Sequence, residues 1–358
     1  WFKGQGVELM SDVAARPAPN LLANGWVKAA LILAAIIVVA ILGARLDGSG
    51  TLYKIFIDPF QQMVSAPDLL VQTVWEGLVS GVLYALIALG FVLIYKATEA
   101  VNFAQGDFMM LGAFLALTFA NDDRMGLPFW LACLLSVAAM AVIGYLVEAI
   151  LIRRMFGESQ IAVVILTISL GIVLRFVAGV IWSHEPQSLQ SPFAGQDVRI
   201  GSLVLGFDDL AIIIVTILLT AGLYLFFART KIGLAMQAAS QNQLAAYYMG
   251  IPVKRVHALV WALAGGVAAI AGILFAAKGT IDPSTGLLGI KASAAAIIGG
   301  FGSLPGALLG GLIIGLVEPL SSRYVAAGVS QIMPYLILLI VLIVRPHGLL
   351  SQVRAKKV

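Results

Sequence analysis

The chain is dominated by hydrophobic runs that are long enough to cross a lipid bilayer. A helix needs about 20 apolar residues to cross about 30 Å of hydrocarbon, at about 1.5 Å per residue. The runs do not alternate apolar and polar residues, as the strands of a membrane β-barrel would. They occupy residues 29–46, 69–95, 104–120, 127–152, 160–183, 208–228, 256–277, 289–301, 304–320 and 331–345. We therefore expect an all-α integral membrane protein, a polytopic helical bundle of about 8–10 membrane segments.

The composition agrees with a membrane protein. Of 358 residues, 61% are hydrophobic and 11% are charged, whereas an average soluble chain has about 25% charged residues. The net charge of +4 comes from Lys and Arg near the ends of the runs, most of them on one side of the predicted membrane, with Lys291 counted on the other side. The positive-inside rule then predicts that both termini lie in the cytoplasm. We expect no binding to nucleic acid.

The chain divides into three parts. Residues 1–66 are predicted to form an N-terminal extension with one extra transmembrane helix, residues 67–350 contain the other runs, and residues 351–358 form a basic cytoplasmic tail. The runs near 104, 289 and 304 are short and rich in glycine or polar residues. The last two could instead form a re-entrant pair that enters and leaves from one side.

A glycine-rich stretch lies between the runs near 289 and 304. Pro305 predicts a helix break near Gly302, and broken helices in transporters often border a substrate cavity. Glycines four residues apart, beginning with Gly302 and Gly306, also let helix backbones approach closely in lipid. The three residues Gly302, Pro305 and Gly306 are therefore candidates for a helix break or for helix packing.

The sequence offers no constellation that would carry catalysis. No phosphate-binding loop of the form Gly-x-x-x-x-Gly-Lys-Ser/Thr occurs, so the chain is not expected to bind ATP by that device. The single cysteine, Cys133, cannot form a disulfide or a thiolate metal site within this chain. The histidines His184, His257 and His347 are far apart in the sequence. We expect no catalytic residue, no metal and no cofactor in this chain, and no enzyme activity of its own.

A polar island stands between two hydrophobic runs, at residues 100–112. A carboxylate at the centre of a membrane helix costs about 2–4 kcal/mol, so polar residues at such depth usually line a pathway or a contact between helices. The candidate translocation-pathway residues are Asn102, Gln105, Gly106 and Asp107. Further ionisable residues in or near the runs are Glu76, Glu148, Arg175 and Glu318. Among these, Arg175 requires an ionic partner, a lipid headgroup or a water-filled cavity.

Two loops are long enough to have structure of their own. The loop Ser183–Gly206, on the predicted outer side, could form part of a docking surface or simply connect two helices. The loop at about 229–256, on the predicted inner side, is amphipathic, and Gly250 followed by Pro252 marks a helix stop. We expect a helix that lies along the cytoplasmic surface.

Three stretches together resemble the permeases of branched-chain amino acid ABC importers of the leucine-isoleucine-valine type. They are Val101-Asn-Phe-Ala-Gln-Gly-Asp-Phe108, Gly81-Val-Leu-Tyr-Ala-Leu-Ile-Ala-Leu-Gly-Phe91 and Ala296-Ile-Ile-Gly-Gly-Phe-Gly-Ser-Leu-Pro-Gly306. The resemblance covers about Leu70 to Leu350 and so makes residues 67–350 the permease domain. Where the family usually has His and Glu, this chain has Gln105 and Asp107, which removes an imidazole and shortens the carboxylate.

The resemblance implies a transport subunit without its own ATPase site, which moves branched-chain amino acids into the cytoplasm through a bacterial plasma (inner) membrane. It implies as partners a homologous second permease, two cytoplasmic ATP-binding subunits that bind the ATP, and an extracytoplasmic substrate-binding protein. The family couples to its ATPases through a loop with Glu-Ala-Ala-x-x-x-Gly. Ala245, Ala246 and Gly250 keep this spacing without the Glu, and are the candidate coupling residues.

Two alternatives stay open at the level of the sequence. The first is a permease for urea or a short-chain amide within the same class of importer. The second is an ion-coupled secondary transporter that would use Asp107, Glu76 or Glu318 and would need no ATPase.

Overall fold

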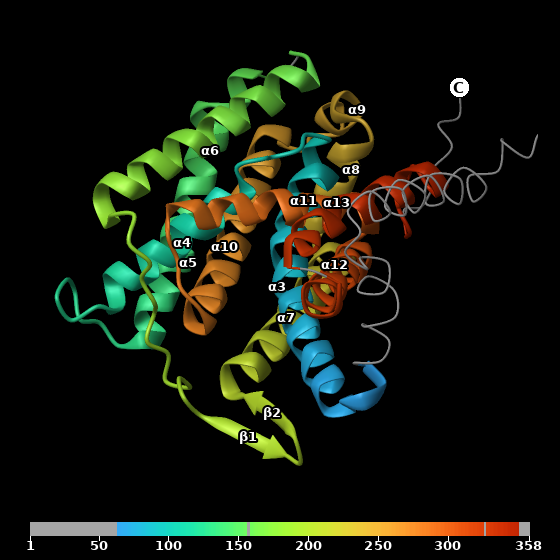
Figure 1. The fold of residues 1–358 in the computed structure, drawn as a ribbon. Helices are drawn as coiled ribbons and strands as arrows, with labels where there is room; N and C mark the ends of the chain where they lie inside the picture. The colour runs from blue at the N-terminus through green and yellow to red at the C-terminus, as the bar shows by residue number, and fades with distance from the viewer. Residues whose placement is uncertain (1–62, 156–157, 326, 351–358) are drawn as a thin grey trace, which may run out of the picture.

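The computed structural model describes residues 63–155, 158–325 and 327–350. The run predicted at 29–46, nearly all of the predicted N-terminal extension and the predicted tail at 351–358 lie outside the described residues. The described chain forms a bundle of helices, with a β-hairpin at one end (Figure 1).

Helices form at the predicted hydrophobic runs. In chain order the elements are α3 (Pro67–Thr98), α4 (Gln105–Ala120), α5 (Phe129–Ile150), η3 (Ile152–Met155), α6 (Gln160–Trp182), β1 (Asp197–Ile200), β2 (Leu203–Gly206), α7 (Phe207–Arg229), α8 (Lys231–Gln241), α9 (Gln243–Tyr248), α10 (Val253–Lys278), η4 (Pro283–Leu287), α11 (Leu288–Gly299), α12 (Leu304–Tyr324) and α13 (Ala327–Val344). Six of the described helices are long and apolar enough to cross a membrane: α3, α5 with η3, α6, α7, α10 and α12. The prediction of an all-α, multi-pass membrane protein is confirmed.

The two ends of the bundle carry different structures, and we name the ends after them. The hairpin end carries β1 and β2, which the sequence did not predict; they pair antiparallel, with Asp197 opposite Gly206. The Gln72 side chain, near the start of α3, bonds both backbone groups of Val204 in β2 and so ties the hairpin to the bundle. The α8–α9 end lies at the other end of α7 (Figure 1).

Helix α3 is the centre of the bundle and is buried along most of its length. It packs against α12 through glycines from both helices. A Cβ added to Gly315 would lie 2.0 Å from the Cα of Gly81, and one added to Gly311 would lie 2.5 Å from the backbone N of Ala85. The two backbones are therefore in contact, as small residues permit in membrane helices.

Helices α4 and α11 are too short to cross a membrane. At about 1.5 Å per residue, α4 (16 residues) is about 24 Å long and α11 (12 residues) about 18 Å, against about 30 Å of hydrocarbon. Helix α4 begins inside the bundle, beside Gly90 of α3, and α11 begins next to it. Their first turns touch, because a Cβ on Gly106 would lie 2.6 Å from the Cα of Gly289. Of the two runs considered as a re-entrant pair, α12 is long enough to cross and α11 is not.

The chain turns between α11 and α12 over residues 300–303. Gly300 has φ +98°, a conformation that favours glycine, and it follows the last residue of α11. The Ser303 side chain accepts a hydrogen bond of 3.1 Å from the Gly306 N–H and so caps α12. Pro305 lies in the first turn of α12, where its missing N–H costs no hydrogen bond.

Candidate functional site

The polar island folds as the interior loop that leads into α4. The side chains of Asn102 and Gln105 have no exposed surface. The Asn102 Oδ1 accepts a hydrogen bond of 3.1 Å from the Ala104 N–H, and its Nδ2 donates one of 3.3 Å to Gln105 Oε1. Gln105 Nε2 in turn donates a 3.1 Å hydrogen bond to the carbonyl of Ala264 in α10. The island thus satisfies its amides inside the protein.

A glycine of α3 makes room for the Gln105 side chain. A Cβ on Gly90 would lie 1.8 Å from Gln105 Nε2. Phe103, two residues before α4, is also held in place. Its backbone N–H donates a 3.2 Å hydrogen bond to Thr167 Oγ1 of α6. The island therefore joins α3, α6 and α10 at the point where α4 starts.

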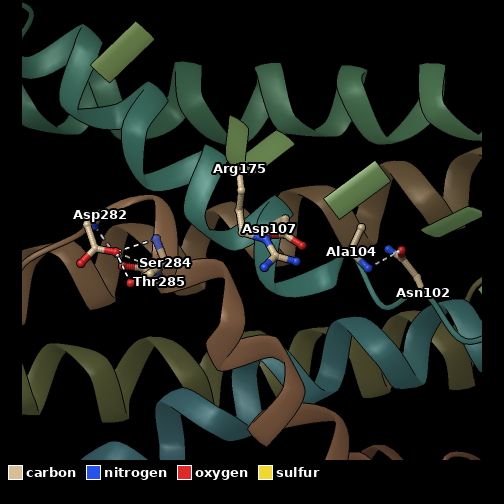
Figure 2. A network of polar contacts seen from close by, with 7 residues as sticks. All are labelled: Asn102, Ala104, Asp107, Arg175, Asp282, Ser284 and Thr285. Carbon is tan, nitrogen blue, oxygen red and sulfur yellow. Dashed lines mark hydrogen bonds and ion pairs between the residues drawn. The ribbon is translucent and has the colours of Figure 1, made fainter. Parts of the chain in front are cut away.

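Asp107 forms an ion pair with Arg175 of α6, which is the partner that the sequence analysis left open. The distance from Arg175 Nε to Asp107 Oδ1 is 2.8 Å, and Figure 2 shows Arg175 reaching from α6 to Asp107. The Asp107 side chain is 2% exposed, whereas that of Arg175 is 28% exposed. Removal of one member of such a buried pair costs about 3–5 kcal/mol, because the other charge is left without compensation.

Two glycines clamp the Asp107 carboxylate from either side. A Cβ on Gly171 of α6 would lie 2.2 Å from Asp107 Oδ2, and one on Gly286 of η4 would lie 2.2 Å from Oδ1. Asp107 also lies in the first turn of α4, where the helix dipole favours a negative charge. The carboxylate is therefore fixed among α4, α6 and η4.

A capping box fixes the segment that brings Gly286 to Asp107. Asp282 Oδ1 accepts hydrogen bonds from the backbone N–H groups of Ser284 (2.6 Å) and Thr285 (3.1 Å). The Thr285 hydroxyl accepts one of 3.0 Å from the Asp282 N–H, which completes the box. Figure 2 shows this cap on one side of Asp107 and the Asn102 turn on the other.

The structure thus brings the four candidate pathway residues together in one buried junction. Gly106 is part of it, because a Cβ there would lie 2.2 Å from the carbonyl oxygen of Gly286. Gly171 and Gly286 were not predicted as members of the junction, and Arg175 was predicted only to require a partner, since all three come from distant segments. In the described part of the chain, no three His, Cys, Asp or Glu side chains gather as a metal site would require.

The amphipathic loop at about 229–256 folds as two short helices, so the prediction of one helix was wrong. Asn242 separates them: its backbone is extended, and its side chain caps α9 by accepting a 2.9 Å hydrogen bond from the Ala245 N–H. Ala246 is buried, Ala245 is exposed, and Gly250 has φ +82° just beyond the end of α9. Of the candidate coupling residues, Ala245 and Ala246 therefore lie in α9, and Gly250 lies just beyond its end.

Helix α9 presents an exposed apolar ridge, which we define as Leu244, Tyr247, Tyr248 and Met249. Each of these side chains is at least 64% exposed. Apolar side chains gathered in this way on a surface indicate a contact with another molecule.

Comparisons with known proteins agree with these features. The family described as branched-chain amino acid transport system / permease component matches residues 73–343. The high-affinity branched-chain amino acid transport system permease protein BraD of Pseudomonas aeruginosa is 30% identical over 301 residues, which cover 80% of this chain and 97% of BraD. The corresponding protein LivH of Escherichia coli (strain K12) is 32% identical over 300 residues, with the same coverage.

An archaeal protein is equally similar. The probable branched-chain amino acid transport permease protein LivH of Methanocaldococcus jannaschii is 33% identical over 284 residues, which cover 75% of this chain and 88% of that protein. The match to the family extends over three quarters of the chain and includes the island, the α8–α9 end and the short helix α11. The chain therefore belongs to the family of permease components of branched-chain amino acid transport systems.

Proposed function

We propose that this chain is the transmembrane permease subunit of an ATP-driven ABC importer that moves branched-chain amino acids into the cytoplasm. Family membership supports the transport role, and the names of BraD and LivH support the class of substrate. The sequence contains no phosphate-binding loop, so the ATP is bound by partner subunits and not by this chain.

The apolar ridge of α9 is the observation that carries the ATP-driven mechanism. A short helix with exposed Leu, Tyr and Met side chains suits a groove on a soluble partner, into which it inserts as a rigid knob. Two cytoplasmic ATP-binding subunits dock on such ridges, one on this chain and one on a homologous second permease. Ala245, Ala246 and Gly250 hold the ridge, and closure of the ATPases moves it.

The α8–α9 end faces the cytoplasm in this proposal. Arg229 ends α7, Lys231 is the first residue of α8, and Lys254 and Arg255 follow α9, so positive charges lie at both ends of the α8–α9 segment. Both termini are then cytoplasmic, and the hairpin end receives amino acids from an extracytoplasmic substrate-binding protein. The membrane is the bacterial plasma (inner) membrane.

In this proposal the polar island lies beside the pathway and fixes the positions of the helices that line it. Asn102, Gln105, Gly106 and Asp107 are too well buried to be reached directly from outside the protomer. Their link to the pathway is the partly exposed Arg175 side chain, whose charge the island neutralises. The turn at residues 300–303, which includes Gly302 and precedes Pro305 and Gly306 in the first turn of α12, separates α11 from α12.

Affinity purification of the tagged chain from its native membranes in mild detergent tests this proposal. We expect a second hydrophobic permease and ATPases with phosphate-binding loops to co-purify. Tyr248→Glu, which sets a charge on the ridge, should remove the ATPases and keep the second permease. Ile200→Glu is the matched control, because it charges an exposed apolar residue at the hairpin end.

Two outcomes would contradict the proposal. Recovery of the chain alone, active in uptake driven by a proton or sodium gradient, would establish a secondary transporter. Retention of the ATPases by Tyr248→Glu at the same level as by Ile200→Glu would show that the ridge is not their docking site.

A further inference from the structure

A second polar cluster lies inside the bundle and joins α3, α11 and α12. The distance from Lys291 Nζ to Glu318 Oε1 is 2.5 Å, and the Tyr84 hydroxyl donates a 2.7 Å hydrogen bond to Glu318 Oε2. The Lys291 and Glu318 side chains are each 20% exposed. Lys291, which the sequence analysis counted on the outer side, lies in the first turn of α11.

The cluster lies inside the bundle, well away from the α8–α9 end. Tyr84 and Glu318 are each about four turns, or about 21 Å, from the α8–α9 end of their helices. Towards the other end, Glu318 is six residues, or about 9 Å, from the last residue of α12, and Lys291 extends from the first turn of α11, whose start touches the first turn of α4. Charged groups at such depth are found against a water-filled cavity or inside protein, and not against lipid.

The Glu148–Arg153 ion pair shows the contrast. It is similar in length, with 2.7 Å between Arg153 Nη2 and Glu148 Oε2, but it joins the end of α5 to η3. There Glu148 is fully buried, and Arg153 lies where α5 leaves the apolar segment. The Glu148–Arg153 pair is thus an anchor at a helix end, whereas the Lys291–Glu318 pair joins the start of α11, inside the bundle, to α12 and keeps part of both side chains exposed.

Branched aliphatic side chains flank the open side of the cluster. Leu287 and Ile290 are exposed, and their spacing to Lys291 puts all three on one face of the short helical segment that η4 and α11 form. Together with the cluster, this face presents the ammonium of Lys291, the carboxylate of Glu318 with the Tyr84 hydroxyl beside it, and the aliphatic side chains of Leu287 and Ile290. A free amino acid with a branched side chain presents the complementary set: a carboxylate, an ammonium and an aliphatic group.

We infer that this face of α11 lines the translocation pathway and forms a transient site for a zwitterionic aliphatic amino acid. Lys291 binds the carboxylate of the amino acid, Glu318 binds its ammonium, and Leu287 and Ile290 contact its side chain. Tyr84 is a positioning residue, since its hydroxyl holds Glu318. The inference rests on the proposed function, because it names the part of the permease that the transported amino acid touches.

Cysteine accessibility tests whether the face is in contact with water. The sequence has one cysteine, so Cys133→Ser gives a cysteine-free background. In the complete transporter, Ile290→Cys should react with a charged, membrane-impermeant methanethiosulfonate, and leucine supplied with the binding protein and ATP should slow the reaction. Val142→Cys is the matched control: it is an exposed apolar position of α5, a helix that carries no residue of the proposed site, and should not react.

Charge exchange tests whether the pair recognises the amino acid or only stabilises the fold. Lys291→Gln and Glu318→Gln should each lower kcat/KM for leucine uptake at least about tenfold, as truncation of one member of a charge pair does. The double variant Lys291→Glu with Glu318→Lys restores an ion pair but reverses its polarity. We expect it to assemble normally and still to transport poorly. The same exchange at Glu148 and Arg153 should preserve uptake.

The outcomes separate this inference from the proposed function. If Ile290→Cys does not react while the complex still takes up leucine, or if charge exchange at Lys291 and Glu318 restores uptake, the face is structural and the inference fails, but the importer assignment stands. If the unsubstituted complex does not couple leucine uptake to ATP hydrolysis, the proposed function fails first.

Discussion

Asp107 shows how a charge is accommodated at membrane depth by several segments at once. Its carboxylate has the Arg175 guanidinium on one oxygen and glycine backbones, at 171 and 286, on both sides. A longer carboxylate or a side chain at either glycine would need the space that is now filled. The shortening from the family's usual Glu to Asp107 therefore fits the narrow gap between α6 and η4.

Loss of this carboxylate should destabilise the protein strongly. Asp107→Ala leaves the Arg175 charge without compensation, and we expect a loss of about 3–5 kcal/mol in the free energy of unfolding. Arg199→Ala, which breaks the exposed Arg199–Asp197 pair of the hairpin, should cost less than about 1 kcal/mol. Unfolding of the purified variants in detergent measures both. Equal effects of the two substitutions would show that the Asp107 pair is not the buried contact described here.

At the scale of the elements, helix bounds were predictable and helix partners were not. The run predicted at 160–183 is helix Gln160–Trp182, and that at 208–228 is Phe207–Arg229, because length and apolarity are local properties. The site was predictable in part for the same reason: the island residues are neighbours in sequence. Arg175 and Gly286 reach it only through the packing of α6 and η4, and Lys291 meets Glu318 and Tyr84 only through the packing of α11 against α12 and α3.

The α3–α12 contact supplies a prediction on packing. Gly315→Ala would put a Cβ 2.0 Å from the Cα of Gly81, so the helices must separate, and we expect a loss of about 1–3 kcal/mol. Gly222→Ala on α7 is the control, because nothing lies within 4 Å of its added Cβ. It should be neutral or stabilise the protein by up to about 1 kcal/mol through helix propensity. Thermal unfolding in detergent compares the two, and equal midpoints would contradict the observed contact.

At the scale of the whole molecule, the two ends of the proposed importer bind different partners: the ATPases bind at the α8–α9 end and the substrate-binding protein at the hairpin end. The bundle must therefore transmit movement of the α8–α9 end to the helices of the pathway. The connection at the α8–α9 end passes through Gly250, whose φ of +82° suits glycine and is strained for a β-branched residue. Nothing lies within 4 Å of an added Cβ there, so a substitution changes the backbone without a clash in the core.

Gly250→Val should therefore uncouple the transporter and leave it folded. We expect ATP hydrolysis by the assembled complex to persist, while leucine uptake falls at least about tenfold. Gly250→Asn is the matched control, because Asn tolerates a left-handed conformation, and it should keep most of the uptake. Uptake in vesicles, normalised to the amount of complex, decides the matter; full uptake by Gly250→Val would exclude this residue from the coupling contact.

The junction at the start of α4 also has a consequence for the order in which the protein folds during its synthesis and insertion into the membrane. Gln105 and Asp107 enter with one of the first described helices, yet their partners Arg175, Ala264 and Gly286 are synthesised up to half the chain later. Until then the two polar side chains have only local partners or water, since lipid offers them none. The contacts of α4 are thus expected to be completed only after η4 has been synthesised.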